Sequence, residues 1–310
     1  MTQSAPLHWP LTPSVDHHQH LCSPAVAAFM GWGGIGTDAA ALIAHMDRAR
    51  VERAAVLSIA YLCGDPKRAA ENEHEQVRAA NDWTGAQVAR FPDRLRGFCG
   101  LNPLRDYALE EIARCAEDPH LRYGLKLHFQ NSLVDYHDPQ HISQLQRIFG
   151  AANDHGMAIV VHMRASTAVH LNLAYGRDEA RTFLEELLPA APDVPVQIAH
   201  LCGGGGYGDP LIHQAVSVFV EAIARNDPRV KRLLFDVTTT ANFLTPLEDL
   251  SLIARHVREL GVERVLYGSD ASDAQGTGNT PRKGWAAFRM APLTDAEFRT
   301  IAGNVAPYMQ

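Results

Sequence analysis

The sequence predicts one α/β domain, a (β/α)8 or TIM barrel that spans residues 1–310. Two observations support this prediction. Eight short apolar, β-rich runs alternate with helix-like segments, and several runs end in histidine or aspartate. Strands that alternate with helices pair in parallel through crossover connections, and eight such units close into a barrel. A chain with 46% apolar residues is also long enough to bury one sizeable core.

The eight runs have the short apolar pattern of buried strands. They cover residues 14–21, 53–61, 95–102, 123–129, 157–163, 194–201, 232–239 and 264–271. An open doubly wound sheet is the alternative, but no GxGxxG fingerprint follows the first run. The glycines at 203–206 follow the sixth run, so they predict a loop rather than a domain linker.

In the segments between the runs, apolar residues recur with the spacing of a helix. Asp38 is an N-cap candidate for a helix over 38–50, and further helices are expected over 141–156, 177–190 and 245–261. The histidines within helical segments are expected at the surface; they are His45, His74, His155, His213 and His256.

Composition excludes several classes of protein. The net charge of −7 argues against a general nucleic-acid binder, and no apolar run approaches the ~20 residues of a membrane helix. The N-terminus lacks the pattern of a secretory signal. The five cysteines are scattered without a CxxC pair, so reduced thiols and a cytoplasmic location are expected; they are Cys22, Cys63, Cys99, Cys115 and Cys202.

The first run contains the segment VDHHQHLCSP, with three histidines in four positions beside an aspartate. Side chains alternate along a strand, so Asp16, His18 and His20 share one face, and His17 and Gln19 share the other. If the even positions point inward, His18 and His20 meet near the C-terminal end of the barrel, where barrel enzymes place their chemistry.

Three later runs also end in residues that bind metals. His162 ends the fifth run, His200 the sixth and Asp270 the eighth. Neutral imidazoles and carboxylates are ligands of zinc and similar divalent ions, and an ion would stabilise histidines that otherwise crowd together. Alternatively, a backbone carbonyl satisfies each histidine separately in the core. Five such side chains at the strand ends favour a common site.

These residues resemble the amidohydrolase superfamily. The resemblance rests on the DxHxH of the first strand, the single histidines His162 and His200, Asp270, and the segments GLKLHF, IAHLCGGG and IAGNVAPYM. Within the superfamily the chain looks like the branch that contains aminocarboxymuconate-semialdehyde decarboxylase and many hydrolases. The resemblance extends from residue 14 to the end of the chain.

The resemblance implies that His18, His20, His162 and Asp270 hold one divalent metal, with zinc expected first and manganese, iron or cobalt as alternatives. It also implies catalytic roles for Asp270, which would accept a proton from metal-activated water, and for His200, which would act as an acid/base or carbonyl-polarising group.

Lys126 on the fourth strand leaves two alternatives open. In some branches of the superfamily a lysine at this strand is carboxylated and bridges two metals, which would place His162 and His200 on the second ion. Otherwise the lysine neutralises a nearby carboxylate or binds substrate.

Four residues are candidate substrate contacts: Lys126, His128, Arg164 and Tyr207. Arg164 lies at the expected rim, where its planar guanidinium could bind a substrate carboxylate or pair with a neighbouring loop. Asp236 on the seventh strand is expected to be structural, and Asp273 is expected in a solvated loop. That loop departs from the aromatic-proline ending frequent among the decarboxylase-like members, which weakens the transfer of any particular substrate.

Three functions follow in order of preference. The first is a metal-dependent hydrolase that cleaves an amide, ester or lactone bond of a small organic molecule. The second is a non-oxidative decarboxylase that uses the same metal on an unsaturated or aromatic carboxylic acid. The third is a barrel that binds metal or ligand without turnover. The expected partner is a small-molecule substrate, with a homodimer as the default assembly.

Overall fold

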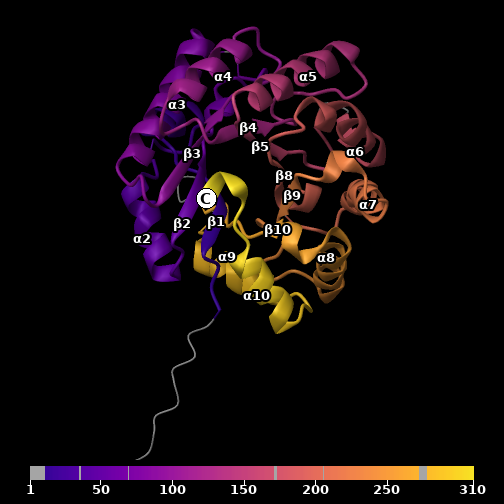
Figure 1. Ribbon diagram of the computed structural model, residues 1–310. Helices are drawn as coiled ribbons and strands as arrows, with labels where there is room; N and C mark the ends of the chain where they lie inside the picture. The colour runs from indigo at the N-terminus through magenta and orange to yellow at the C-terminus, as the bar shows by residue number, and fades with distance from the viewer. Residues whose placement is uncertain (1–10, 35, 69, 171–172, 205, 272–277) are drawn as a thin grey trace, which may run out of the picture.

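The chain folds into a barrel of eight parallel strands surrounded by helices (Figure 1). This computed structural model describes residues 11–34, 36–68, 70–170, 173–204, 206–271 and 278–310. The strands pair in the order β1-β2-β3-β4-β5-β8-β9-β10, and every one lies within a predicted run. Their bounds are β1 Val15–Gln19, β2 Arg53–Leu57, β3 Leu95–Gly100, β4 Gly124–His128, β5 Ala158–His162, β8 Val196–Ile198, β9 Leu233–Asp236 and β10 Val265–Leu266. The predicted (β/α)8 architecture is therefore confirmed.

Backbone hydrogen bonds between β1 and the segment that follows β10 close the barrel. The amide of His17 donates to the carbonyl of Tyr267 at 2.9 Å, and the amide of Asp270 donates to the carbonyl of His18 at 2.8 Å. These bonds bring the end of β10 beside β1, so residues from opposite ends of the chain meet at one edge of the barrel.

Helices cover the outside of the barrel (Figure 1). Asp38 caps α2 as predicted, because its carboxylate accepts the amide of Ala41 at 2.9 Å. The expected helix over 177–190 begins as α6 and continues through a π turn and a 3-10 turn. The helices are α1 Pro24–Phe29, α2 Ala39–Ala49, α3 Glu73–Ala89, α4 Ala108–Glu117, α5 Pro139–Asp154, α6 Arg177–Thr182, α7 Pro210–Ala224, α8 Leu247–Leu260, α9 Pro281–Phe288 and α10 Asp295–Gly303. Among the residues described, no helix is both long and apolar enough to cross a membrane.

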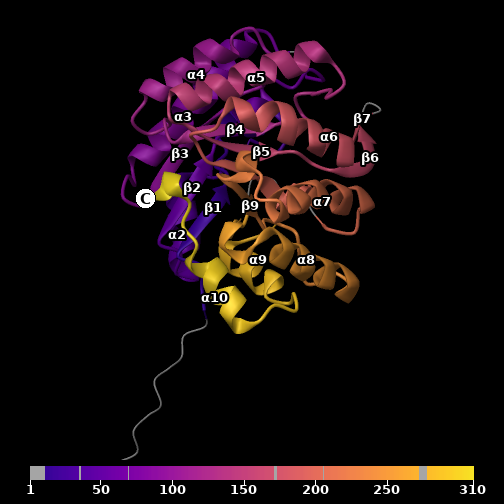
Figure 2. The ribbon, with the colours of Figure 1, turned by 45° about the vertical axis from the view of Figure 1, so that its right-hand side comes forward.

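A small antiparallel hairpin lies between β5 and α6, and the eightfold alternation does not predict it. It consists of β6 Ser166–His170 and β7 Leu173–Tyr175, and it stands at the rim beside α6 and α7 (Figure 2). The Tyr175 hydroxyl donates to the carbonyl of Val134 at 2.6 Å, which fixes the base of the hairpin to the loop after β4.

The C-terminus closes the end of the barrel where the strands begin. Ala306, Tyr308 and Met309 are buried against residues of the barrel interior that include Val15 and Phe98. Figure 1 shows the chain end lying across the middle of the ring of strands. The end of the barrel that holds the histidines is therefore the open one.

Two cysteines do not follow the prediction of free thiols. Cys99 of β3 and Cys115 of α4 form a disulfide, whereas Cys22, Cys63 and Cys202 are free and buried. Packing of α4 against the barrel brings the two Cα atoms to 6.1 Å, within the range that a disulfide spans. The sequence separation of 16 residues carries no sign of this approach.

A buried carboxylate beside this disulfide should contribute strongly to stability. Glu111 of α4 is fully buried and accepts hydrogen bonds from Asn81 of α3 at 2.7 Å and from the Arg114 guanidinium at 2.7 and 2.8 Å. We expect Glu111→Ala to lower the free energy of unfolding by about 3 kcal/mol, because the buried amide of Asn81 and the half-buried guanidinium of Arg114 both lose a charged acceptor. Urea denaturation measures the change, with the exposed neighbour Glu110→Ala as the control. Equal stability of the two variants would contradict this account.

Candidate active site

Three of the predicted ligands meet where β1 and β10 end. His18 lies within β1, His20 follows it, and Asp270 follows β10. Each offers one donor atom, and these atoms all lie within 4.8 Å of one another. His20 Nε2 and Asp270 Oδ1 are 3.4 Å apart. The structure thus brings together residues separated by 250 positions in the chain.

The hydrogen bonds of the two histidines determine which nitrogen faces the site. His18 Nδ1 lies 3.1 Å from Asp236 Oδ2, and His20 Nδ1 lies 2.6 Å from the carbonyl oxygen of Leu57. A carboxylate and a carbonyl only accept, so each Nδ1 carries the proton and each Nε2 presents a lone pair. Burial lowers the pKa of His20 to about 3, which keeps its ring neutral. This is the state that a metal requires of its ligands, so the donor set fits a divalent ion.

His162 lies at the end of β5 beside this cluster. Its ring centroid is 4.4 Å from that of His200 and 4.1 Å from that of His128. Its Nε2 is buried and has no hydrogen-bond partner in the part of the chain that the structure describes. An unsatisfied buried nitrogen costs about 1–3 kcal/mol, so this atom also fits a site that a ligand completes. It is not one of the three donors within 4.8 Å of one another.

His200 is placed by an unusual turn after β8. His200, Leu201 and Cys202 have φ values of 57°, 46° and 70°, and left-handed backbone costs non-glycine residues roughly 1–2 kcal/mol each. The Nδ1 of His200 lies 2.8 Å from the carbonyl oxygen of Thr238 and 3.0 Å from Thr239 Oγ1. Its Nε2 therefore presents a lone pair as well, and burial lowers the pKa of the ring to about 4.

Asp236 of β9 links His200 to the metal-ligand candidate His18, and the sequence does not reveal this role. Its carboxylate accepts from His18 Nδ1 at 3.1 Å and from Gln197 Nε2 at 2.6 Å. It also accepts the amides of His200 at 2.9 Å and Thr238 at 3.1 Å. Burial alone would raise its pKa, but His18 and these donors hold the pKa well below its usual range. The expectation of a structural aspartate is incomplete, because Asp236 also contacts the candidate site residues His18 and His200.

Two other polar residues form a layer beneath the site. Asp16 accepts the amide of Ser269 at 3.0 Å and the amide of His18 at 3.2 Å, which ties β1 to the end of β10. Gln197 of β8 connects Asp236 to the hydroxyl of Tyr308 in the C-terminal turn. A polar residue within an apolar strand run is the one sequence signal that could have indicated Gln197.

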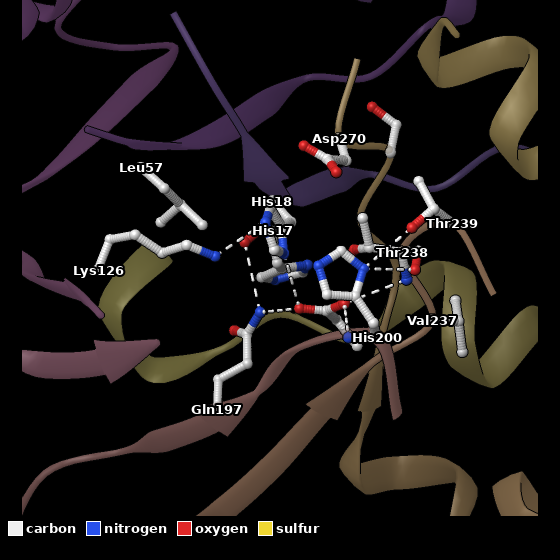
Figure 3. Close-up of polar contacts among 12 residues, drawn as sticks. His17, His18, Leu57, Lys126, Gln197, His200, Val237, Thr238, Thr239 and Asp270 are labelled. Atoms are coloured by element: carbon white, nitrogen blue, oxygen red, sulfur yellow. Dashed lines mark hydrogen bonds and ion pairs between the residues drawn. The ribbon is translucent and has the colours of Figure 1, made fainter. Parts of the chain in front are cut away.

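Lys126 and His128 of β4 point into the same region. Lys126 is fully buried, and its Nζ lies 3.1 Å from His18 Nε2 (Figure 3). Burial lowers its pKa to about 8, against the opposing effect of nearby carboxylates. The His128 ring packs on His162, and its Nδ1 accepts the amide of Asn131 at 3.2 Å. Both substrate-contact candidates of β4 are therefore adjacent to the histidine cluster.

Arg164 is two residues beyond the end of β5 and is half-buried. Burial lowers the pKa of His128 well below its ordinary value, and the charges of Lys126 and Arg164 add to the effect. The structure thus places this third candidate close to the same cluster.

Tyr207 lies apart from these residues. Its buried hydroxyl lies 2.8 Å from His256 Nδ1, and His256 Nε2 lies 2.8 Å from His213 Nδ1. This chain of hydrogen bonds runs outward between α7 and α8. His256 is 1% exposed, so its predicted surface position is wrong. It lies on the apolar face of α8 beside the buried Ile253 and Val257. Asp273, expected in a solvated loop, lies outside the described residues.

Comparisons with known proteins agree with this architecture. The sequence model of the amidohydrolase family matches residues 15–306. No curated protein matches the chain. One similar structure is 5-carboxyvanillate decarboxylase from Sphingomonas paucimobilis, which is 16% identical, covers 94% of this chain and 96% of its own, and has a TM-score of 0.60.

Two further structures contain metals. An amidohydrolase from Burkholderia multivorans with bound zinc is 13% identical over 94% of this chain and 96% of its own, with a TM-score of 0.57. A 5-carboxyvanillate decarboxylase from Novosphingobium aromaticivorans, complexed with manganese, is 12% identical over 94% of each chain, with a TM-score of 0.60. At these identities the likeness shows the fold.

Proposed function

Since the chain belongs to the amidohydrolase family, a family of metal-dependent enzymes, we propose that it hydrolyses an amide, ester or lactone bond of a small organic substrate. The observation that carries this proposal is the convergence of His18, His20 and Asp270, whose donor atoms lie within 4.8 Å of one another. The lone pairs of both imidazoles face this point, which is the arrangement that a divalent ion needs.

The residues that would hold the ion are His18, His20 and Asp270, with His162 as the fourth ligand. Zinc is the first expectation, and manganese, iron or cobalt would suit the same donors. When bound, such an ion supplies Lewis acidity and lowers the pKa of water to near neutrality. The amine of Lys126, 3.1 Å from His18 Nε2, adds positive charge beside the ligands. Whether that amine stays free or becomes carboxylated, to bridge a second ion on His162 and His200, is decided by the metal stoichiometry.

The remaining chemistry falls to two side chains. Burial would raise the pKa of Asp270, but His20, His18 and His200 hold the pKa below its usual range. Its carboxylate is therefore ionised and can accept a proton from the attacking water. His200 presents the lone pair of Nε2, so it can take up a proton and return it to the leaving group. Both acceptors are present before substrate binds, which suits a reaction that begins by deprotonating water.

Non-oxidative decarboxylation is the second candidate. It is favoured by the cationic groups Lys126 and Arg164 beside the cluster and by the decarboxylases among the similar structures. Measurement of carbon dioxide release against acid release, on a panel of lactones, esters, amides and carboxylated aromatics, separates the two reactions. Acid release without carbon dioxide supports hydrolysis, and carbon dioxide from the carboxylated aromatics alone supports decarboxylation.

Removal of the metal should abolish either reaction. We expect chelation to reduce turnover about 10³-fold or more, because Lewis-acid assistance is worth several kcal/mol and each ~1.4 kcal/mol is a factor of ten in rate. Addition of zinc or manganese should restore the activity. The measurement is turnover of the best substrate from the panel, followed together with the metal content of the protein. Undiminished turnover by protein that contains no metal would rule out the proposal.

A further inference from the structure

Among the described residues, Arg164 differs from other partly buried arginines because its guanidinium has neither an acidic nor a carbonyl partner, whereas Arg264, for example, donates to the carbonyl of Val230 at 2.8 Å. Arg105 pairs with Glu73 at 2.7 Å, and Arg114 pairs with Glu111 at 2.7 Å. Across the described segments, by contrast, the guanidinium of Arg164 makes no hydrogen bond or ion pair, although the residue is half-buried. Burial of an unpaired cation costs free energy, so a group that is held this way fits an anion from outside the chain.

The backbone around Arg164 fixes the position of its side chain. Arg164 has a left-handed backbone with φ 56°, and the amide of the following Ala165 donates to the carbonyl of Cys202 at 2.6 Å. This bond ties the loop after β5 to the loop after β8. The turn that follows His162 therefore directs the arginine toward the glycine-rich segment rather than along the strand.

Gly204 in that segment provides the space that the arginine occupies. A Cβ atom at position 204 would lie 2.6 Å from Arg164 Cγ and 2.9 Å from both Cδ and Nε. These distances are shorter than real Cβ atoms show, so the side chain of Arg164 lies directly on the glycine backbone. Two loops are thus built around one arginine.

Arg164 also lies beside the histidine cluster at the strand ends. Arg164 is two residues after His162, which ends β5 and whose ring centroid lies 4.1 Å from that of His128. An anion bound by the guanidinium would therefore be held beside the residues that are proposed to perform the chemistry.

We propose that Arg164 is an anion subsite that recognises a substrate carboxylate distinct from the bond that is cleaved. The planar guanidinium donates two parallel hydrogen bonds to a carboxylate, and this pairing is both strong and directional. The substrate class is then a carboxylated ester, amide or lactone. That the bound carboxylate belongs to a substrate rests on the proposed function. The carboxylate site itself can be tested by binding alone.

The first test compares two probes of the same shape on zinc-loaded protein. Benzoate and benzamide differ in charge, and their dissociation constants can be measured by calorimetry for wild type, Arg164→Gln and Arg122→Gln. Arg122 is an exposed arginine before β4 and serves as the charge-matched control. We expect Arg164→Gln to weaken benzoate binding about 10- to 100-fold, the range of a lost charge-assisted hydrogen bond, with little change for benzamide. Equal effects on both probes, or none on benzoate, would overturn the subsite.

A second variant, at Gly204, keeps the positive charge of Arg164 but changes the position of its guanidinium. Gly204→Ala should displace the arginine and weaken benzoate binding, and the double variant with Arg164→Gln should bind no more weakly than Arg164→Gln alone. Gly150→Ala is the control, because a Cβ there meets only one atom, at 3.9 Å. Additive losses would show that Gly204 acts elsewhere and would contradict the packing argument. Thermal unfolding of each variant confirms that the protein remains folded.

A kinetic comparison separates this inference from the proposed function. Phenyl acetate and 4-carboxyphenyl acetate differ only in the carboxylate, and Arg164→Gln should raise KM for the second ester while sparing the first. If neither ester is hydrolysed and the rest of the substrate panel also fails, the hydrolase proposal fails and the benzoate measurement still decides the subsite. If both esters respond alike to Arg164→Gln, the carboxylate proposal fails while hydrolysis stands.

Discussion

Replacement of Asp270 by alanine is expected to lower kcat about 10²- to 10⁴-fold, the range for loss of a positioned acid/base group. The physical reason is that this carboxylate serves two purposes. Its Oδ1 lies 3.4 Å from His20 Nε2, within the group of three metal donors, and it is held ionised by the surrounding histidines. Its loss removes one metal ligand and one proton acceptor together. The measurement is kcat on the best substrate, with bound metal determined on the same samples.

Asp270→Asn separates these two contributions. The amide keeps one oxygen that can face the ion, but it cannot accept the proton of an attacking water. We expect Asp270→Asn to retain more metal than Asp270→Ala while it remains nearly as inactive. Asp178→Ala, whose side chain is 73% exposed on α6, is the control for a lost carboxylate. Turnover of Asp270→Ala at the wild-type rate would remove this residue from the mechanism.

Replacement of Asp236 by alanine should produce the second large effect, a 10- to 100-fold loss of metal affinity, the range that orienting partners of metal ligands usually show. Asp236 fixes the tautomer of His18 through the contact of 3.1 Å to Nδ1. It also accepts the backbone amide of His200 in its left-handed turn. Without this carboxylate, the His18 ring loses the acceptor that fixes its tautomer, and the turn loses the acceptor of the His200 amide.

The effect of Asp236→Ala can be measured by competition with a zinc chelator of known affinity. Asp178→Ala again serves as the control, since it removes a carboxylate that faces solvent. An unchanged zinc affinity for Asp236→Ala would mean that the ring of His18 is held by other contacts. It would limit Asp236 to the structural role that the sequence suggests.

The barrel could be predicted from the sequence because its signal is repeated. Each of the eight strands lies within an apolar run, and the alternation with helices leaves few arrangements for so many parallel strands. The hairpin of β6 and β7 is a single irregular insertion with no such repetition, so it escapes the pattern. The disulfide between Cys99 and Cys115 depends on how α4 packs against β3, which local sequence does not encode.

The candidate site likewise contains some residues that the sequence could place and others that it could not. His18 and His20 could be placed together because side chains two apart on a strand share a face. The role of Asp236 could not be predicted, since a single carboxylate at a strand end looks the same whether it faces a partner or the core. The sequence makes Tyr207 a candidate substrate contact, but its hydroxyl lies 2.8 Å from His256 Nδ1, away from the histidine cluster. Loop direction depends on backbone angles such as those of His200, and these are set by tertiary contacts.

The central claim is that His18, His20 and Asp270 hold one divalent cation. Anomalous diffraction at the zinc edge, from crystals of the zinc-loaded protein, tests this claim most directly. The account predicts a strong peak within bonding distance of both Nε2 atoms and of the carboxylate, with His162 facing the same ion. A zinc ion bound only elsewhere, with these three side chains coordinating nothing, would contradict it.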